Sequence, residues 1–187
     1  MTDVYVGIDQ SYSGFGLVEF HSPDNPMKGL AHLKKFDGKN LGPGITRLVA
    51  IEKWLDETFM DIRGRHHTPH VVMEGYAAGA KFGREKAGEL GHTVKRVLYT
   101  YNVYPTIVAP TALKKFVLGK GSGGKNEMLL GVYRRWGVEF DNDNLADAYA
   151  LSRLAYLLEH PDEVEFKYEQ EVIKALTYET ERWPRPA

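Results

Sequence analysis

The chain has 187 residues, of which 43% are hydrophobic and 26% charged, and its formal net charge is −1. These values are typical of one globular domain of ordinary size. The absence of cysteine excludes disulfides and cysteine-ligated zinc or iron–sulfur sites. No apolar run approaches the roughly 18 residues of a membrane span, and the N-terminal segment lacks the form of a signal peptide, so we expect a cytoplasmic protein.

The pattern of the chain predicts a run of strands followed by alternating helices and strands. The first half predicts the strands Val4–Asp9, Gly14–Phe20 and Gly29–Phe36, the amphipathic helix Thr46–Ile62 and the short strand Val71–Glu74. The second half predicts the helix Phe82–Tyr101, the strand Pro105–Ala109 and the helices Thr111–Leu118, Asn126–Trp136 and Asn144–Leu158. This order predicts an α/β fold with a five-stranded mixed sheet flanked by helices. We expect one domain over residues 1–160 and an acidic extension over residues 161–187.

Three acidic residues occur at positions that suggest one metal site. Asp9 and Glu74 end two predicted strands, and Asp147 lies near the start of the last core helix. A carboxylate that ends a buried strand lies at the carboxyl edge of the sheet, where α/β proteins bind their ligands. Three such groups repel one another unless a cation holds them, and oxygen ligands suit Mg²⁺ or Mn²⁺. Two such ions on clustered carboxylates are typical of phosphodiester hydrolysis.

Each of these residues also has a structural interpretation. Asp9 could cap a helix or form a turn, and Asp147 could form a buried salt bridge with Arg153. Asn144 and Asp143 lie one turn before Asp147, so either could share a metal ion with it. The glycines at 14 and 16 allow another part of the backbone to pass close by, or they form a bulge. Residues 7–16 match GIDxSxxxxG, a pattern that also occurs in the actin-like nucleotide-binding fold. That fold needs two such domains, for which the chain is too short.

The loop Gly119–Asn126 reads GKGSGGKN and resembles a phosphate-binding P-loop only in part. Asn126 stands where a Ser or Thr would bind Mg²⁺, and the preceding segment is predicted to be helical, whereas a P-loop follows a buried strand. Two other interpretations remain: a flexible glycine linker, or a loop whose amides and lysines bind a DNA phosphate.

Charge is distributed unevenly along the chain. Residues 79–135 contain eleven Lys or Arg and three Glu, whereas residues 139–181 contain twelve acids and three Lys or Arg. This polarity indicates either a surface that faces phosphate, with its counter-charge elsewhere, or a chance clustering of solvated residues. The adjacent His66 and His67 lie in a predicted surface loop, and we interpret them as solvated residues rather than zinc ligands.

Together these segments resemble the RuvC-type Holliday-junction resolvases of the RNase H-like nuclease superfamily. The resemblance extends from about residue 4 to residue 158. It rests on VGIDQSYSGFGLV, VVMEGYAAGAKFGREKAGELG, APTALKKFVLGKGSGGK and NLADAYALSRLA. The third segment is the most specific, because it combines a Pro, a Lys four residues later and a glycine-rich loop that ends in Lys.

The resemblance implies a role for each matching residue. The expected metal ligands are Asp9, Glu74 and Asp147, joined by Asn144 or Asp143, and the expected catalytic set adds Lys125. The expected DNA-binding residues are Lys114, Lys125, Lys120, Lys81, Arg84, Tyr76 and Phe82. The family motif often has two acids in D-x-x-D-A, whereas this chain has Asn144 at the first position, where the side-chain carbonyl oxygen can still bind Mg²⁺.

The resemblance implies a Mg²⁺-dependent endonuclease, in which Mn²⁺ can substitute, that cuts four-way DNA junctions and leaves 5′ phosphate and 3′ hydroxyl ends. It also implies a symmetric homodimer, for which Phe82–Tyr101 is the predicted interface, in a bacterial cell or a phage-infected host. Three alternatives remain. The protein could be a broader nuclease for flaps or RNA–DNA hybrids, a catalytically weak junction-binding protein, or a small nucleotide-binding protein that uses Gly119–Asn126.

Overall fold

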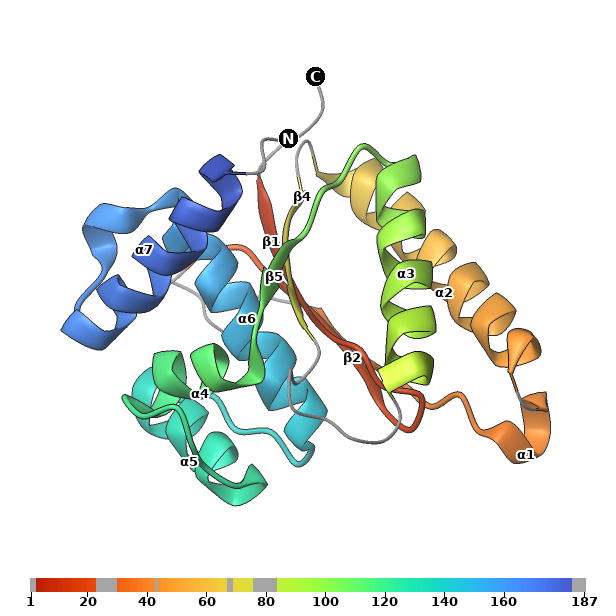
Figure 1. Cartoon of the computed structure of the whole chain (residues 1–187), viewed down its shortest axis with the longest axis horizontal. Coiled ribbons are helices and arrows are strands. Elements are labelled where there is room, and N and C mark those ends of the chain that lie inside the picture. The colour runs from red at the N-terminus through yellow and green to blue at the C-terminus, as the bar shows by residue number, and fades with distance from the viewer. Residues whose placement is uncertain (1–2, 23–29, 43, 67–68, 76–83, 183–187) are drawn as a thin grey trace.

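A computed structural model of the chain shows a five-stranded sheet between two layers of helices (Figure 1). It describes residues 3–22, 30–42, 44–66, 69–75 and 84–182, and of residues 84 and 178–182 it describes the backbone alone. The strands are β1 (Val4–Asp9), β2 (Phe15–Phe20), β3 (Ala31–Lys34), β4 (Pro69–Glu74) and β5 (Thr106–Val108). The predicted α/β architecture with a mixed sheet is confirmed.

The strand order β3-β2-β1-β4-β5 decides which chain ends meet. β1, β4 and β5 run parallel, whereas β2 and β3 pair antiparallel beside them. Ile8 of β1 lies beside Met73 of β4 in the register. The next residue of each strand is Asp9 and Glu74 respectively, so the two acids come together at the carboxyl edge of the sheet.

The helices form one layer on each face of the sheet (Figure 1). One layer contains α2 (Ile45–Arg65) and α3 (Arg84–Thr100); the other contains α4 (Pro110–Leu118), α5 (Lys125–Trp136), α6 (Asp143–Glu159) and α7 (Lys167–Arg182). Five of these match predicted helices within a few residues. The short helix α1 (Gly38–Leu41) and the 3-10 turn η1 (Pro161–Glu163) were not predicted, because segments of three or four residues carry no periodicity.

Alternate residues of the central strands face opposite helical layers. Val6 and Ile8 of β1 belong to the core under α2 and α3, whereas Tyr5 belongs to the core under α6. Gly7 lies directly against α6, since a Cβ there would come within 1.8 Å of the Ala148 carbonyl oxygen. A Cβ on Gly16 would lie 2.4 Å from the Asn144 carbonyl oxygen. Gly7 and Gly16 thus allow α6 to approach the sheet, and at Gly16 this close approach is one of the two interpretations that the sequence left open.

The acidic end of the chain folds back onto part of the basic middle. Val172, Ile173 and Leu176 of α7 are buried in the core shared with α4 and α6. Lys115 of α4 pairs with Glu171 at 2.6 Å. Arg135 of α5, whose guanidinium lies 4.5 Å from the centre of the Trp136 ring, pairs with Glu169. These two cations are therefore neutralised within the fold.

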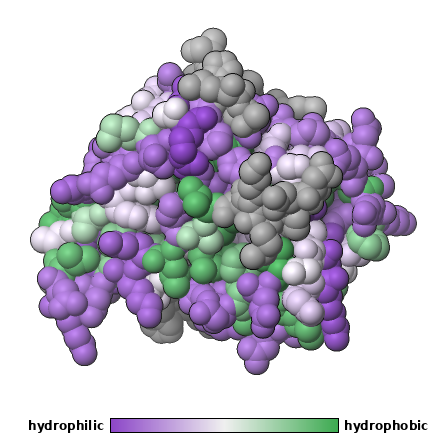
Figure 2. All heavy atoms as spheres, turned by 180° about the vertical axis from the view of Figure 1, so that it is seen from behind, coloured by the Kyte–Doolittle hydropathy of each residue, from purple (hydrophilic) through white to green (hydrophobic). Residues whose placement is uncertain are grey.

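The apolar stripe of α3, which suggested a dimer interface, lies inside the protein. Leu90, Val94, Val97 and Leu98 are all buried in the core beneath α2 and α3. The stripe is therefore explained by the packing of this domain. The face in Figure 2 is mainly hydrophilic, with hydrophobic residues in a band across its middle. No helix in the described part of the chain is long and apolar enough to span a membrane.

Candidate metal centre

Asp9, Glu74 and Asp147 come from β1, β4 and α6 and interact with one another. Asp9 and Glu74 follow Gly7 and Val72 by two residues, so strand alternation turns both side chains toward α6. Asp9 is only 6% exposed. Asp9 and Glu74 form a side-chain hydrogen bond, and the charges of Glu74 and Asp147 both act on Asp9. The predicted convergence of distant segments is therefore present.

The pKa values of these carboxyl groups show that their charges are poorly compensated. Burial, followed by the charges of Glu74 and Asp147, raises the pKa of Asp9 well above its usual value. Burial also raises the pKa of Glu74, although the hydrogen bond with Asp9 and the charge of Lys114 oppose this shift. Burial therefore disfavours the charged forms of both acids, and Lys114 is the one cation among the causes of these two shifts.

Asp147 is the third member of this group. Burial raises its pKa to about 7, with further contributions from the charges of Glu74 and Asp143. One carboxylate oxygen, Oδ1, is buried and has no hydrogen-bond partner in the described structure. The alternative salt bridge with Arg153 is not found: the Arg153 guanidinium lies over the Phe20 ring, 4.7 Å from its centre.

The N-terminus of α6 arranges the two residues that could share an ion with Asp147. Asn142 caps the helix, because its side-chain oxygen accepts hydrogen bonds from the amides of Asn144 and Leu145 at 3.0 and 3.3 Å. Asp143 forms an ion pair with Lys125 at 2.5 Å. The Asn144 side chain lies against Gly14, where a Cβ would be 2.4 Å from its Nδ2 atom. Asp143 is therefore already paired, whereas Asn144 lies between α6 and the start of β2.

Two lysines lie close enough to act on the carboxylates. Lys114 of α4 lowers the pKa of both Glu74 and Asp147, although burial outweighs it. Lys125, at the start of α5, also opposes the rise in the pKa of Asp147. Lys120 differs, because it pairs with Glu127 at 2.7 Å and is not among the charges that shift the pKa values of the three acids. Helix α4 precedes the glycine loop, so the strand–loop–helix arrangement of a P-loop nucleotide site is absent there.

Gln10 belongs to this site, but sequence reasoning did not identify it. Its side-chain nitrogen donates a hydrogen bond of 2.9 Å to the Glu74 carbonyl oxygen, which ties the ends of β1 and β4 together. Its side-chain oxygen is buried without a partner in the described structure. Its position directly after Asp9 was the available signal, because a polar residue there also lies at the carboxyl edge of the sheet.

The donor set fits a hard divalent cation. It consists of carboxylate and amide oxygens, it contains an unpartnered buried oxygen, and its acids have raised pKa values. Among the described residues, the oxygens of Asp9, Glu74 and Asp147 are spread too widely for all three to lie within 4.8 Å of one another.

Four of the expected DNA-binding residues cannot be placed at the site. Tyr76, Lys81 and Phe82 lie outside the described residues, and for Arg84 only the backbone at the start of α3 is described.

Comparisons with known proteins identify the fold. No family model and no curated protein matches the sequence. A structure of T. thermophilus RuvC in complex with a Holliday junction substrate matches with a TM-score of 0.62 and 21% identity, covering 80% of this chain and 90% of that one. A second structure of Thermus thermophilus RuvC matches with a TM-score of 0.62 and 20% identity, covering 84% and 96%. The chain therefore has a RuvC-type, RNase H-like fold.

Proposed function

We propose that this chain is a Mg²⁺-dependent endonuclease that cuts branched DNA, with four-way junctions as its main substrate. The observation that carries the proposal is the meeting of Asp9, Glu74 and Asp147 at one edge of the sheet, with raised pKa values and a buried unpartnered oxygen. The same fold occurs in a RuvC structure that contains a Holliday junction, which supports the choice of substrate.

The carboxylates would hold the metal ions, with Asp9 between Glu74 on one side and Asp147 on the other. Asn144 is the better candidate for the additional oxygen ligand, because Asp143 already pairs with Lys125. Bound Mg²⁺ would supply an activated water and stabilise the leaving oxygen of phosphodiester hydrolysis. Gln10 would keep the ends of β1 and β4 at a fixed separation through its hydrogen bond to the Glu74 carbonyl oxygen.

The lysines would act on the DNA phosphate. Lys114 and Lys125 both act on the carboxylates, so a phosphate beside those carboxylates would lie within reach of their charges. Lys125 is 78% exposed and is oriented by Asp143, which leaves its other N–H groups available to a phosphate oxygen. We assign Lys120 a smaller part, because its charge is not among those that act on the pKa values of the three acids.

We also propose that the active form is a symmetric dimer. A four-way junction has two equivalent strands to cut, which calls for two active sites related by a two-fold axis. The buried stripe of α3 does not provide the interface. Tyr99, on the outside of the same helix, is 59% exposed and packs edge-on against Tyr104, so it offers an aromatic contact instead. Light scattering of the protein with and without a junction would measure the stoichiometry.

Cleavage of end-labelled DNA tests the proposal. A four-way junction, a flap, an RNA–DNA hybrid and a linear duplex of matched sequence would be incubated with Mg²⁺, with Mn²⁺ or with chelator, and the products mapped to the nucleotide. We expect paired, metal-dependent cuts near the branch point of the junction. Equal cleavage of all four substrates would indicate a broader nuclease. Tight junction binding without metal-dependent cleavage would indicate a binding protein.

A further inference from the structure

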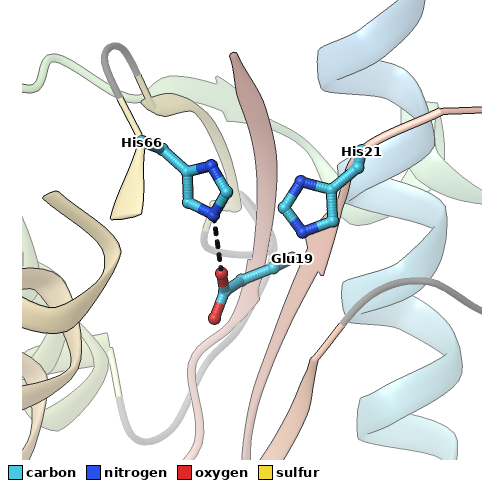
Figure 3. Close-up of side chains that lie close together, drawn as sticks. All are labelled: Glu19, His21 and His66. Atoms are coloured by element: carbon cyan, nitrogen blue, oxygen red, sulfur yellow. Dashed lines mark ion pairs between the residues drawn. The ribbon is translucent and has the colours of Figure 1, made fainter. Parts of the chain in front are cut away.

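A cluster of two histidines and one glutamate lies at the other end of the sheet. Glu19 is near the end of β2, His21 follows that strand, and His66 caps the C-terminus of α2. One ligand atom from each of the three lies within 4.8 Å of the other two. In Figure 3 the two imidazole rings lie next to each other, with the Glu19 carboxylate beside the His66 ring, and the ring centres are 4.7 Å apart. Glu19 pairs with Val6 near the start of β1, whereas Asp9 ends that strand, so the cluster is separate from the carboxylate site.

Glu19 is a buried carboxylate that the protein keeps ionised. Its side chain is fully buried, and Arg65 Nη2 donates hydrogen bonds to both of its oxygens at 3.0 and 2.9 Å. His32 Nε2 lies 3.2 Å from Oε1. Burial tends to raise the pKa of Glu19, but the hydrogen bonds with His32 and Arg65 outweigh it and lower the pKa. The carboxylate is therefore held in place from two sides, by Arg65 and by His32.

His66 is buried, and its environment in the described structure leaves it incompletely satisfied. It is 9% exposed, so the interpretation of this residue as a solvated loop histidine is wrong. Its Nε2 lies 3.1 Å from Arg65 Nη1, which is always a donor, so Nε2 must accept and Nδ1 must carry the proton. Nδ1 is buried and has no hydrogen-bond partner among the described residues. The nitrogen that faces the cluster is Nε2, 4.0 Å from Glu19 Oε2, so its lone pair is the one that an ion beside Glu19 would use, whereas Nδ1 lies on the far side of the ring.

We propose that Glu19, His21 and His66 form a binding site for a transition-metal ion of the Zn²⁺ type. Two imidazole nitrogens and one carboxylate oxygen are the donors that Zn²⁺ prefers, whereas Mg²⁺ prefers oxygen alone. Contact distances near 2.1 Å place neighbouring ligand atoms of a tetrahedral ion about 3.4 Å apart, so small side-chain rotations would close the cluster. His32 would remain hydrogen-bonded to the second oxygen of Glu19 and orient the carboxylate.

Arg65 would compete with the ion for Glu19 and His66. Its guanidinium contacts both Glu19 and His66, so it occupies the region between two of the ligands. It also pairs with the exposed Asp61 at 2.9 Å, and its own side chain is 34% exposed. The guanidinium can therefore retain Asp61 as a partner while the ion takes its place beside Glu19. The bound ion would join β2 to the end of α2 and stabilise this end of the domain.

Zn²⁺ titration in an excess of Mg²⁺ tests the site, because Mg²⁺ saturates an oxygen-only centre and does not compete for imidazole. Chelator-treated protein would be titrated with Zn²⁺ by calorimetry, and Co²⁺ would be used as a spectroscopic probe of tetrahedral coordination. We expect one Zn²⁺ per chain, a higher thermal unfolding midpoint and the visible absorption of tetrahedral Co²⁺. The same results are expected in the Asp9→Asn variant, which separates this site from the proposed nuclease centre.

Substitutions locate the ion. His21→Gln should weaken Zn²⁺ binding at least about 10-fold and leave the fold intact, because this side chain is only half-buried. His92→Gln, which changes an exposed histidine on α3, should leave the affinity unchanged. Arg65→Gln should increase the affinity by removing the competing cation. Absence of Zn²⁺ binding in the native protein, unchanged affinity after His21→Gln, or weaker binding after Arg65→Gln would each overturn the proposal.

Discussion

Asp9 and Glu19 lie on neighbouring strands and are both almost fully buried, yet their pKa values shift in opposite directions. Burial is the largest influence on each. Around Asp9 the nearest charges are those of other acids, which raise its pKa further. Around Glu19 the hydrogen bonds with His32 and Arg65 reverse the effect of burial. The comparison indicates that the fold satisfies one buried carboxylate with its own cations and leaves the other to an external cation.

Replacing Asp9 should have the largest effect on activity. Asp9→Asn removes the central ligand charge, so we expect Mg²⁺-dependent junction cleavage to fall on the order of 10³-fold. The free energy of unfolding should stay the same or increase, because the substitution removes charge repulsion from the Asp9–Glu74 pair. Single-turnover cleavage and denaturant unfolding measure the two effects. Asp162→Asn, at an exposed acid, is the matched control. Cleavage at the native rate by Asp9→Asn would show that the metal centre is misassigned.

Replacing Glu19 should instead affect stability. Glu19→Gln leaves Arg65 and His32 without their shared anion, and we expect the free energy of unfolding to fall by about 2–3 kcal/mol at pH 7. The exposed substitution Glu57→Gln should change it by less than about 0.5 kcal/mol. The folded-state pKa of Glu19 is lowered, so its stabilising contribution is present above its unfolded pKa and is lost as the pH falls through the folded value. An equal loss of stability at pH 3 and pH 7 would contradict this account.

Substitutions of the lysines should separate those that act on the phosphate at the carboxylate site from one that does not. Lys114→Gln and Lys125→Gln should each slow junction cleavage about 10-fold or more, because each removes a charge near the phosphate. Lys120→Gln should slow it less than about threefold, because Lys120 is not among the charges that act on the carboxylates. Rates measured at saturating DNA separate this effect from weaker binding. If all three variants cleave at equal rates, none of these lysines has a special position at the site.

The proximity of the three acids could be predicted from the sequence because strand ends and helix starts fix their positions, whereas their role as metal ligands stays a prediction. Asp9 and Glu74 end buried strands, so parallel pairing of those strands was enough to bring them together. Asp147 needed one further condition, the close approach of α6, which the small residues Gly7 and Gly16 permit. Each step depends on local patterns and a common topology.

The histidine cluster could not be predicted in this way. His66 follows an amphipathic helix and has the sequence context of a polar loop. Its ring is buried and lies close to Glu19 and His21, which are distant in the sequence. The contact of Arg65 with Glu19 joins residues 46 positions apart and has no signature in either segment. The return of α7 onto α4 and α5 was missed for the same reason, because charge balance along a chain does not specify which residues pair.

The last expected effect is the pH dependence of the metal-free protein, which concerns stability alone. The folded-state pKa of Asp147 is about 7, above its unfolded value, so the folded protein binds a proton that the unfolded chain releases. The free energy of unfolding of metal-free protein should therefore decrease as the pH rises from about 4 to above 7. Asp147→Asn mimics the protonated form, and we expect it to stabilise metal-free protein at pH 8 by about 1–2 kcal/mol, once relaxation around the partly buried group is allowed for.

Two controls decide whether this dependence comes from the carboxylate site. At pH 4 the stabilisation by Asp147→Asn should almost vanish, because the native side chain is then protonated in the folded state. Saturating Mg²⁺ should remove it at pH 8 as well, because the ion compensates the charge that the substitution deletes. Denaturant unfolding with chelator and with Mg²⁺, at pH 4 and at pH 8, measures the stabilisation by Asp147→Asn under four conditions. A stabilisation that is equal under all four conditions would reflect packing at position 147 and not an uncompensated charge.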